Sequence, residues 1–179
     1  MGNKGNMENM SNNLRIIKID SLMPQQLNQF SELLVSVVDD GASIGFLPPM
    51  SKDEAINYWH KVIEPGVILW AVVQNDSIVG TIQLQLAHKQ NARHRAEIAK
   101  LMVHPEYRRM GIAQLLMQTA EEQARTESRT LLVLDTRAGD PSNHLYLSFG
   151  YTEAGRIPNY AESADGTLHE TVYYYKQIG

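Results

Sequence analysis

The residues best suited to hold an anion form the stretch Tyr107–Ala113, which reads Tyr-Arg-Arg-Met-Gly-Ile-Ala. It follows the apolar run 98–103 and precedes an amphipathic segment, so the pattern predicts a strand, a tight turn and a helix start. A helix start presents unpaired N–H groups and the positive end of the peptide dipoles. Gly111 lets the backbone approach an anion, and Arg108 and Arg109 add charge suited to phosphate. The turn is therefore a candidate pyrophosphate site, with an ordinary glycine turn as the alternative.

Two carboxylates fall in neighbouring predicted strands. Glu97 shares strand parity with Leu101 and Val103, which places an acid on an otherwise apolar face. Asp135 ends an apolar run that is typical of a buried strand. Both are expected in a crevice at the carboxyl ends of adjacent strands, where partial burial raises the proton affinity of a carboxylate. The alternatives are an exposed strand residue for Glu97 and a turn cap for Asp135.

The composition is that of a globular chain and limits its chemistry. With 179 residues, of which 43% are hydrophobic and 20% charged, the chain can bury a real core. It contains no cysteine, which excludes disulfides, thiolate metal sites and a cysteine acyl-enzyme. The six histidines lack the spacing of metal ligands, so no metal is expected.

The charge and the apolar segments indicate the partners and the compartment. The formal net charge is −4, and no basic run is longer than Arg108-Arg109, so nucleic acid is not expected as a partner. No segment resembles a signal peptide or reaches membrane-spanning length, so no membrane contact and a cytoplasmic location are expected.

The apolar periodicity predicts one compact domain, 14–179, after a disordered polar tail, 1–13. The expected order is a strand, two helices, three strands, a helix, a strand, a short helix and two strands. These elements are expected at 14–20, 24–38, 51–63, 67–73, 78–86, 95–103, 111–127, 130–135, 141–148, 151–157 and 168–177. On the helix 111–127 the pattern turns Glu121 outward, toward solvent.

This order, with a basic glycine turn after the fourth strand, resembles the GNAT superfamily of acetyl-CoA-dependent N-acetyltransferases. The family's loop reads Gln/Arg-x-x-Gly-x-Gly/Ala, which Arg108, Gly111 and Ala113 match. A second family mark, a leucine-tyrosine pair followed by glycine-aromatic, is present at 145–151. The segments 41–46, 132–139 and 155–160 are similar to the tabtoxin-resistance branch of the superfamily.

The resemblance implies a fold and a cosubstrate. The fold is α/β (α+β), with a central, mostly antiparallel mixed sheet of about seven strands flanked by helices. The cosubstrate is acetyl-CoA, held by residues of the fourth strand and the turn, namely Met102, Val103, Arg108, Arg109, Met110, Gly111, Ile112 and Ala113. In the family a bulge past the middle of the fourth strand turns a backbone N–H toward the thioester carbonyl, a place occupied here by Met102 or Val103. The early asparagine of the short helix is missing, because Asn143 is too close to Tyr146 to replace it.

The resemblance also assigns the catalytic groups. An alkyl amine with a pKa of about 10.4 arrives protonated and needs a base. Glu97 and Asp135 are the implied bases or a water-mediated relay, and the sequence leaves open which of them accepts the proton. Tyr146 is the implied acid for the departing thiolate, with a buried structural tyrosine as the alternative.

The acceptor is implied to be a small amino-acid-like amine, as in a tabtoxin-type resistance enzyme. The family builds the wall of this pocket from segments that contain Asp40, Phe46, Trp59 and Tyr160. Two other readings stay open: a protein lysine or N-terminus as the acceptor, and a non-catalytic acyl-CoA-binding module. The resemblance also favours a homodimer.

Overall fold

The computed structural model describes residues 14–179, and the predicted disordered tail, 1–13, lies outside the described residues. Within the described part, no helix is both long and apolar enough to cross a membrane. The elements are β1 Arg15–Ile19, α1 Pro24–Asp39, α2 Lys52–Trp59, β2 Val67–Gln74, β3 Ser77–Leu86, β4 Arg95–Val103, α3 Ile112–Thr126, β5 Leu131–Arg137, α4 Ser142–Ser148, β6 Thr152–Glu162 and β7 Leu168–Gln177. Short 3-10 turns cover Gln90–Ala92 (η1) and Pro105–Tyr107 (η2). The predicted order of strands and helices is confirmed.

Strand β6 is longer than predicted by several residues, and β5 continues two residues past its expected end. Strand β6 continues to Glu162, past the expected end at Ile157. Its register against β7 shifts between Ile157 and Ala161, and Asn159 adopts a left-handed φ of 54°. This irregularity breaks the two-residue alternation on which the sequence prediction depended.

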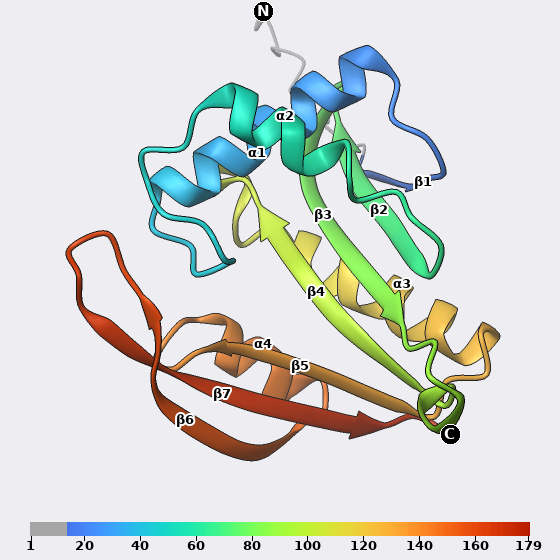
Figure 1. Ribbon diagram of the computed structural model, residues 1–179. Coiled ribbons are helices and arrows are strands. Elements are labelled where there is room, and N and C mark those ends of the chain that lie inside the picture. The colour runs from blue at the N-terminus through green and yellow to red at the C-terminus, as the bar shows by residue number, and fades with distance from the viewer. Residues whose placement is uncertain (1–13) are drawn as a thin grey trace, which may run out of the picture.

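The seven strands form one sheet in the order β1-β2-β3-β4-β5-β7-β6. All neighbours are antiparallel except β4 and β5, which are parallel. The β4–β5 pairing covers only Arg95–Glu97 against Leu131–Val133. Beyond it the two strands diverge toward their carboxyl ends (Figure 1). The mixed sheet predicted from the sequence is therefore present, and it is split along the middle.

Helices cover both faces of the sheet. We call the side covered by α3 and α4 the α3 face, and the side covered by α1, α2 and their connecting loop the α1 face (Figure 1). Alternate residues of β2 enter the two cores: Trp70 packs with α3, and Leu69 packs with α1 and α2. Gly80 of β3 lets α3 approach closely, because a Cβ there would lie 2.6 Å from Ile112.

Strand β4 contains a β-bulge that reverses the faces of its residues. Its register against β3 shifts between Ala99 and Met102. Lys100, inside the bulge, has a left-handed φ of 51°, which is uncommon for a residue other than glycine. As a result Ile98 packs in the core under α3, whereas Met102 packs in the core under α1 and α2.

The bulge overturns the strand parity expected for Glu97. The neighbours of Glu97, Ala96 and Ile98, both pack on the α3 face, so Glu97 lies on the α1 face. Leu101 and Val103, beyond the bulge, pack against the α3-face core. The expectation that Glu97 shares a face with Leu101 and Val103 is therefore wrong. A sequence pattern read with a strict period of two cannot contain the extra residue.

Candidate active site

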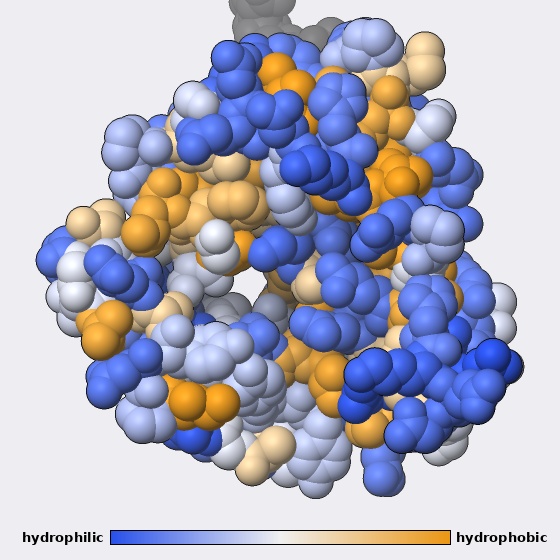
Figure 2. All heavy atoms as spheres, in the orientation of Figure 1, coloured by the Kyte–Doolittle hydropathy of each residue, from blue (hydrophilic) through white to orange (hydrophobic). Residues whose placement is uncertain are grey.

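A cleft of about 1210 Å³ occupies the place where β4 and β5 diverge. Its walls come from β4, the α1–α2 loop, the turn before α3, the end of β5, α4 and part of β6 and β7. Figure 2 shows the hollow between the part of the molecule that carries α1 and α2 and the part that carries β5, β6 and β7. Residues from both faces of the sheet line the cleft, so two ligands that enter from opposite faces can meet in it.

The basic turn has the geometry of an anion cradle. Gly111 is the N-cap of α3 with a φ of 81°, and no side chain caps the helix start. Arg109 is also left-handed, with a φ of 62°. A Cβ at Gly111 would meet no atom within 4 Å, because the position opens into the cleft. Uncapped helix N–H groups beside an open space and two arginines suit a pyrophosphate.

The residues predicted to bind the cofactor are distributed unevenly around this cradle. The cleft is lined by Met102, Val103, Arg108, Arg109, Gly111, Ile112 and Ala113. Met110 instead packs against the core beneath α3 and is absent from the lining among the described residues. Met110 was predicted to bind the cofactor because it lies in the turn, but its apolar side chain packs against the core.

The two carboxylates share the α1 face at the start of the divergence. Leu132 and Leu134 pack on the α3 face, so Asp135 lies on the α1 face with Glu97. Asp135 accepts a hydrogen bond from Thr171 Oγ1 at 2.9 Å. Partial burial raises the pKa of Glu97, and the charge of Asp135 raises it further. Across residues 14–179, no group of three or more histidines and acids is placed to hold a metal ion.

Tyr146 reaches the cleft from the opposite face. It lies on α4, is 6% exposed and packs within the α3-face core. Burial raises its pKa above the ordinary tyrosine value, and the charge of Asp135 contributes in the same direction. The ring also lines the cleft. Tyr146 is thus a neutral phenol that faces the divergence, on the other side of the sheet from the two carboxylates.

One backbone N–H of β4 points into the divergence. His104 donates its N–H to the Val79 carbonyl of β3 at 2.9 Å. Because backbone groups alternate along a strand, the N–H of Val103 points away from β3, toward the side from which β5 has departed. Val103 lines the cleft. Of the two predicted positions, Met102 and Val103, the geometry therefore favours Val103 as the donor to a carbonyl oxygen.

The predicted acceptor residues are not all at the site. Phe46 and Tyr160 line cavities on the α1 face. Asp40 also lies there but forms an ion pair with Arg108, with Oδ2 and Nη1 2.6 Å apart. Trp59 is wrongly predicted, because it is fully buried between the helices and donates its indole N–H to the Phe30 carbonyl. An aromatic residue at helical spacing is more often part of a core, and that reading holds here.

Asn143 is fully engaged within the fold. Its amide donates to the carbonyls of Arg137 and Asp140 at 2.9 and 2.8 Å, and its Oδ1 accepts from the Tyr174 hydroxyl at 2.8 Å. It therefore holds the β5–α4 turn in place.

Two cations at the site escaped the sequence prediction. Lys100 and Arg137 both line the cleft. Lys100 is brought there by the bulge, which the sequence alone does not place. Arg137 follows Asp135 by two residues on β5 and so shares its face, a signal that the strand parity did contain.

The profile of the acetyltransferase (GNAT) family matches residues 24–151. A relative, the uncharacterized N-acetyltransferase in the hisH-hisA intergenic region of Azospirillum brasilense, is 28% identical over 123 residues. That match covers 67% of this chain and 73% of the relative.

Solved structures share the fold over nearly the whole chain. An N-acetyltransferase from Staphylococcus aureus has a TM-score of 0.79 and 18% identity, covering 93% of this chain and 99% of its own. The structure of yncA from Salmonella typhimurium, with its cofactor acetyl-CoA, has a TM-score of 0.76 and 16% identity. The match covers 93% of this chain and 94% of that chain. An aminoglycoside 6'-N-acetyltransferase complexed with coenzyme A has a TM-score of 0.73 and 19% identity. The match covers 92% of this chain and 97% of that chain.

Proposed function

Because the chain belongs to the acetyltransferase (GNAT) family, we propose that it transfers an acetyl group directly from acetyl-CoA to the primary amine of a small amino-acid-like molecule. A detoxification role of the tabtoxin-resistance type is the form of this activity that the sequence segments favour. Acetyl-CoA or coenzyme A is present in two of the structures that share the fold, which supports it as the cosubstrate.

The observation that carries the proposal is the placement of opposite proton functions on opposite faces of the split sheet. Glu97 and Asp135 lie on the α1 face, and Tyr146 lies on the α3 face. An alkyl amine is protonated at neutral pH and must lose a proton before it can attack. As the carbon–nitrogen bond forms and the carbon–sulfur bond breaks, the nitrogen loses a second proton and the thiolate gains one. A base side and an acid side are therefore both required.

The two carboxylates divide the work on the amine. A general base is most effective when its pKa lies near the working pH, and the pKa of Glu97 is raised in that direction. Asp135 is held by Thr171 and supplies part of the charge that raises the pKa of Glu97. We assign proton acceptance to Glu97 and binding of the ammonium group to Asp135.

The α3 face serves the thioester end. The open Gly111 position, the uncapped start of α3 and Arg109 would hold the pyrophosphate, with Arg108 as a further cation. When bound, acetyl-CoA supplies an activated acetyl group. The Val103 N–H is placed to donate to the carbonyl oxygen. Tyr146, kept protonated by its raised pKa, is placed to protonate the departing sulfur.

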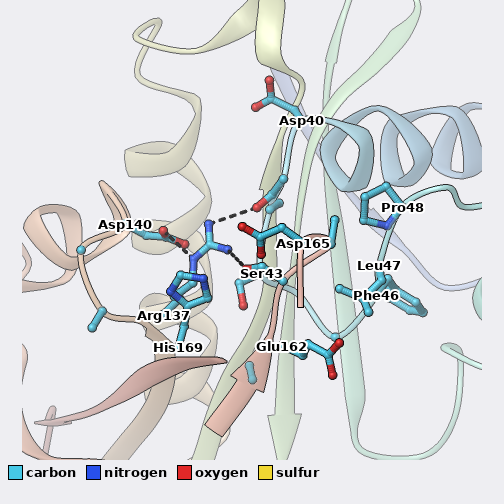
Figure 3. Close-up of a pocket in the computed structure, with 18 residues that line it drawn as sticks. Asp40, Ser43, Phe46, Leu47, Pro48, Arg137, Asp140, Glu162, Asp165 and His169 are labelled. Carbon is cyan, nitrogen blue, oxygen red and sulfur yellow. Dashed lines mark hydrogen bonds and ion pairs between the residues drawn. The ribbon is translucent and has the colours of Figure 1, made fainter. Parts of the chain in front are cut away.

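The volume and the walls of a cavity on the α1 face support a small acceptor. A second cavity of about 890 Å³ adjoins the cleft and is walled by the α1–α2 loop, the β5–α4 turn and the β6–β7 hairpin. Arg137 connects all three walls (Figure 3). A cavity of this volume, bounded by three connected segments, fits a small molecule.

A competition among acceptors tests the proposed class. Free-thiol release from acetyl-CoA is measured with tabtoxinine-β-lactam, amino acids and polyamines, and in parallel with lysine-containing and N-terminally free peptides. We expect turnover of an amino-acid-like amine and little turnover of peptides. Preferential turnover of peptides would replace the small acceptor with a protein one. Saturable acetyl-CoA binding without turnover of any amine would leave a binding module.

A further inference from the structure

Two cations on the acceptor side of the cleft, Lys100 and Arg137, have no function in the acetyl transfer described above. We propose that they form a subsite for an acidic group of the acceptor, so that the substrate carries a carboxylate as well as the reacting amine. This inference rests on the proposed acetyltransferase activity. It names the two residues that recognise the second functional group of the acceptor.

Lys100 is directed into the α1 side by the bulge in β4. Its Nζ donates to the Ile44 carbonyl and lies 5.5 Å from the centre of the Phe46 ring. Burial lowers the pKa of Lys100, while the charges of Asp135 and Glu97 act against that change. A lysine in a left-handed conformation costs backbone energy, and such strain is typical of functional positions.

Arg137 approaches the same loop from the other diverging strand. Its Nε donates to Asp140 at 2.9 Å, which neutralises one edge of the guanidinium. The remaining nitrogens donate to the Gly41 carbonyl and the Ser163 hydroxyl, each at 3.1 Å. The group is mostly buried, with 21% of the side chain exposed.

The two cations share a feature that favours an anionic ligand. Both reach the α1–α2 loop, Lys100 at Ile44 and Arg137 at Gly41, and both bind neutral carbonyl oxygens there. A carboxylate is a stronger partner for an ammonium or guanidinium group than a carbonyl or a hydroxyl is. An acidic group that enters between β4 and β5 can therefore replace these neutral partners.

The positions of the charges fit a zwitterionic molecule. Asp135 and Arg137 are two residues apart on one face of β5, a separation of about 7 Å along a strand. Along β4, Glu97 and Lys100 repeat this order, with the acidic residue first and the basic residue after it. On both strands the acid lies at the start of the divergence and the cation lies further along. An acceptor with its amine at the acids and its carboxylate at the cations satisfies both pairs.

The competing explanation is that the two cations only hold the loop in place. A structural tie would affect charged and uncharged acceptors alike, whereas a subsite discriminates between them. The test therefore compares β-alanine, γ-aminobutyrate and δ-aminovalerate with their carboxamides, as acceptors in thiol release and as ligands in calorimetry with coenzyme A present. The series varies the distance between the amine and the acid.

We expect the wild-type protein to prefer one acid over its carboxamide by about 10- to 100-fold, the range of a hydrogen bond to a charged group. Lys100→Met and Arg137→Gln should each reduce that ratio toward one, and Lys61→Met, at an exposed lysine outside both cavities, should keep it. Thermal unfolding of all three variants reports on folding.

Equal use of acid and carboxamide by the wild-type protein would overturn the subsite, as would an equal loss of both acceptors in the variants. Binding separates this inference from the proposed activity. Selective binding of the acid without thiol release would support the subsite and contradict the acetyltransferase. Thiol release with simple amines and no preference for acids would support the acetyltransferase and contradict the subsite.

Discussion

At the scale of single residues, the β-bulge in β4 decides which side chains of that strand lie on each face of the sheet. The bulge at Lys100 sends that side chain and Met102 to the α1 face and leaves Leu101 and Val103 on the α3 face. Tyr146 approaches from the α3 face, where it is 6% exposed and lines the cleft. A protonated phenol that faces the cleft can donate its proton to a ligand.

The first prediction concerns Tyr146→Phe. The change removes only the hydroxyl from a packed ring, so we expect normal folding and acetyl-CoA affinity within about twofold of wild type. Loss of a general acid should lower kcat by about 100-fold. Steady-state kinetics and calorimetry measure the two effects. A variant that turns over at the wild-type rate would remove Tyr146 from the mechanism.

The second prediction concerns the acidic limb of the pH profile of kcat/KM. Glu97 must be deprotonated to act, so activity should rise with pH through a pKa above the ordinary glutamate value. Asp135→Asn removes a negative neighbour and should lower the pKa of Glu97, which moves the limb to lower pH. Glu97→Gln should reduce kcat/KM by about 100-fold at neutral pH. If Asp135→Asn moves the limb to higher pH, the assignment of the base is incorrect.

Sequence reasoning identified most of the residues proposed to react, but not their surroundings. Glu97, Asp135, Tyr146 and Gly111 all line the cleft. For Glu97 this holds although the strand parity expected for it was wrong, because the bulge in β4 changes the face of the residues beyond it. The sequence could not place Lys100, whose direction is set by the extra residue of the bulge. Trp59 was misassigned because helical spacing does not distinguish a pocket wall from the space between two helices.

At the scale of elements, the turn from β4 into α3 combines several local requirements. Pro105 begins the short turn η2, Arg109 and Gly111 take left-handed conformations, and α3 begins at once. Glycine supports such a conformation without strain, and its missing side chain leaves room for a ligand. The strand, turn and helix were predictable from the sequence because local composition determines them.

The third prediction tests this turn. In Gly111→Glu the new side chain would enter the open space beside the start of α3 and oppose a phosphate with its charge. Acetyl-CoA affinity should fall by at least about 100-fold while the fold is retained. Calorimetry measures the affinity, and circular dichroism reports on the fold.

Gly166→Glu is the matched control for the third prediction. Gly166 has a φ of 80° and lies near the tip of the β6–β7 hairpin, so the substitution repeats the backbone strain and the charge away from the turn. Acetyl-CoA affinity should be close to that of wild type. Unchanged affinity in Gly111→Glu, or an equal loss in both variants, would contradict the assignment of the turn.

At the scale of the whole molecule, the two halves of the split sheet are held together at its narrow end. Glu121 of α3 was expected to face solvent but is 5% exposed. Its carboxylate accepts two hydrogen bonds from Lys176 of β7, at 2.9 and 2.7 Å, and lies 3.6 Å from Arg125. The helical pattern of α3 could not reveal this pair, because its partner comes from the end of the chain.

The fourth prediction is that Glu121→Gln destabilises the protein. Removing one partner leaves the charge of Lys176 poorly compensated, and the cost should be about 1–3 kcal/mol because Lys176 still reaches water. The Tm should fall by several degrees. Glu122→Gln, at the exposed neighbour on the same helix, should leave the Tm nearly unchanged. Equal Tm values for the two variants would show that the Glu121–Lys176 pair contributes little.

The central claim is that the divergence of β4 and β5 is a site of acetyl transfer to an amine. The most direct measurement follows acetyl-CoA with a reactive amino acid acceptor, and quantifies free thiol and N-acetylated amine in the same samples. We expect the two products in equal amounts, at a rate that falls sharply in Tyr146→Phe and Glu97→Gln. Thiol release without acetylated amine, or equal rates in all three proteins, would contradict the claim.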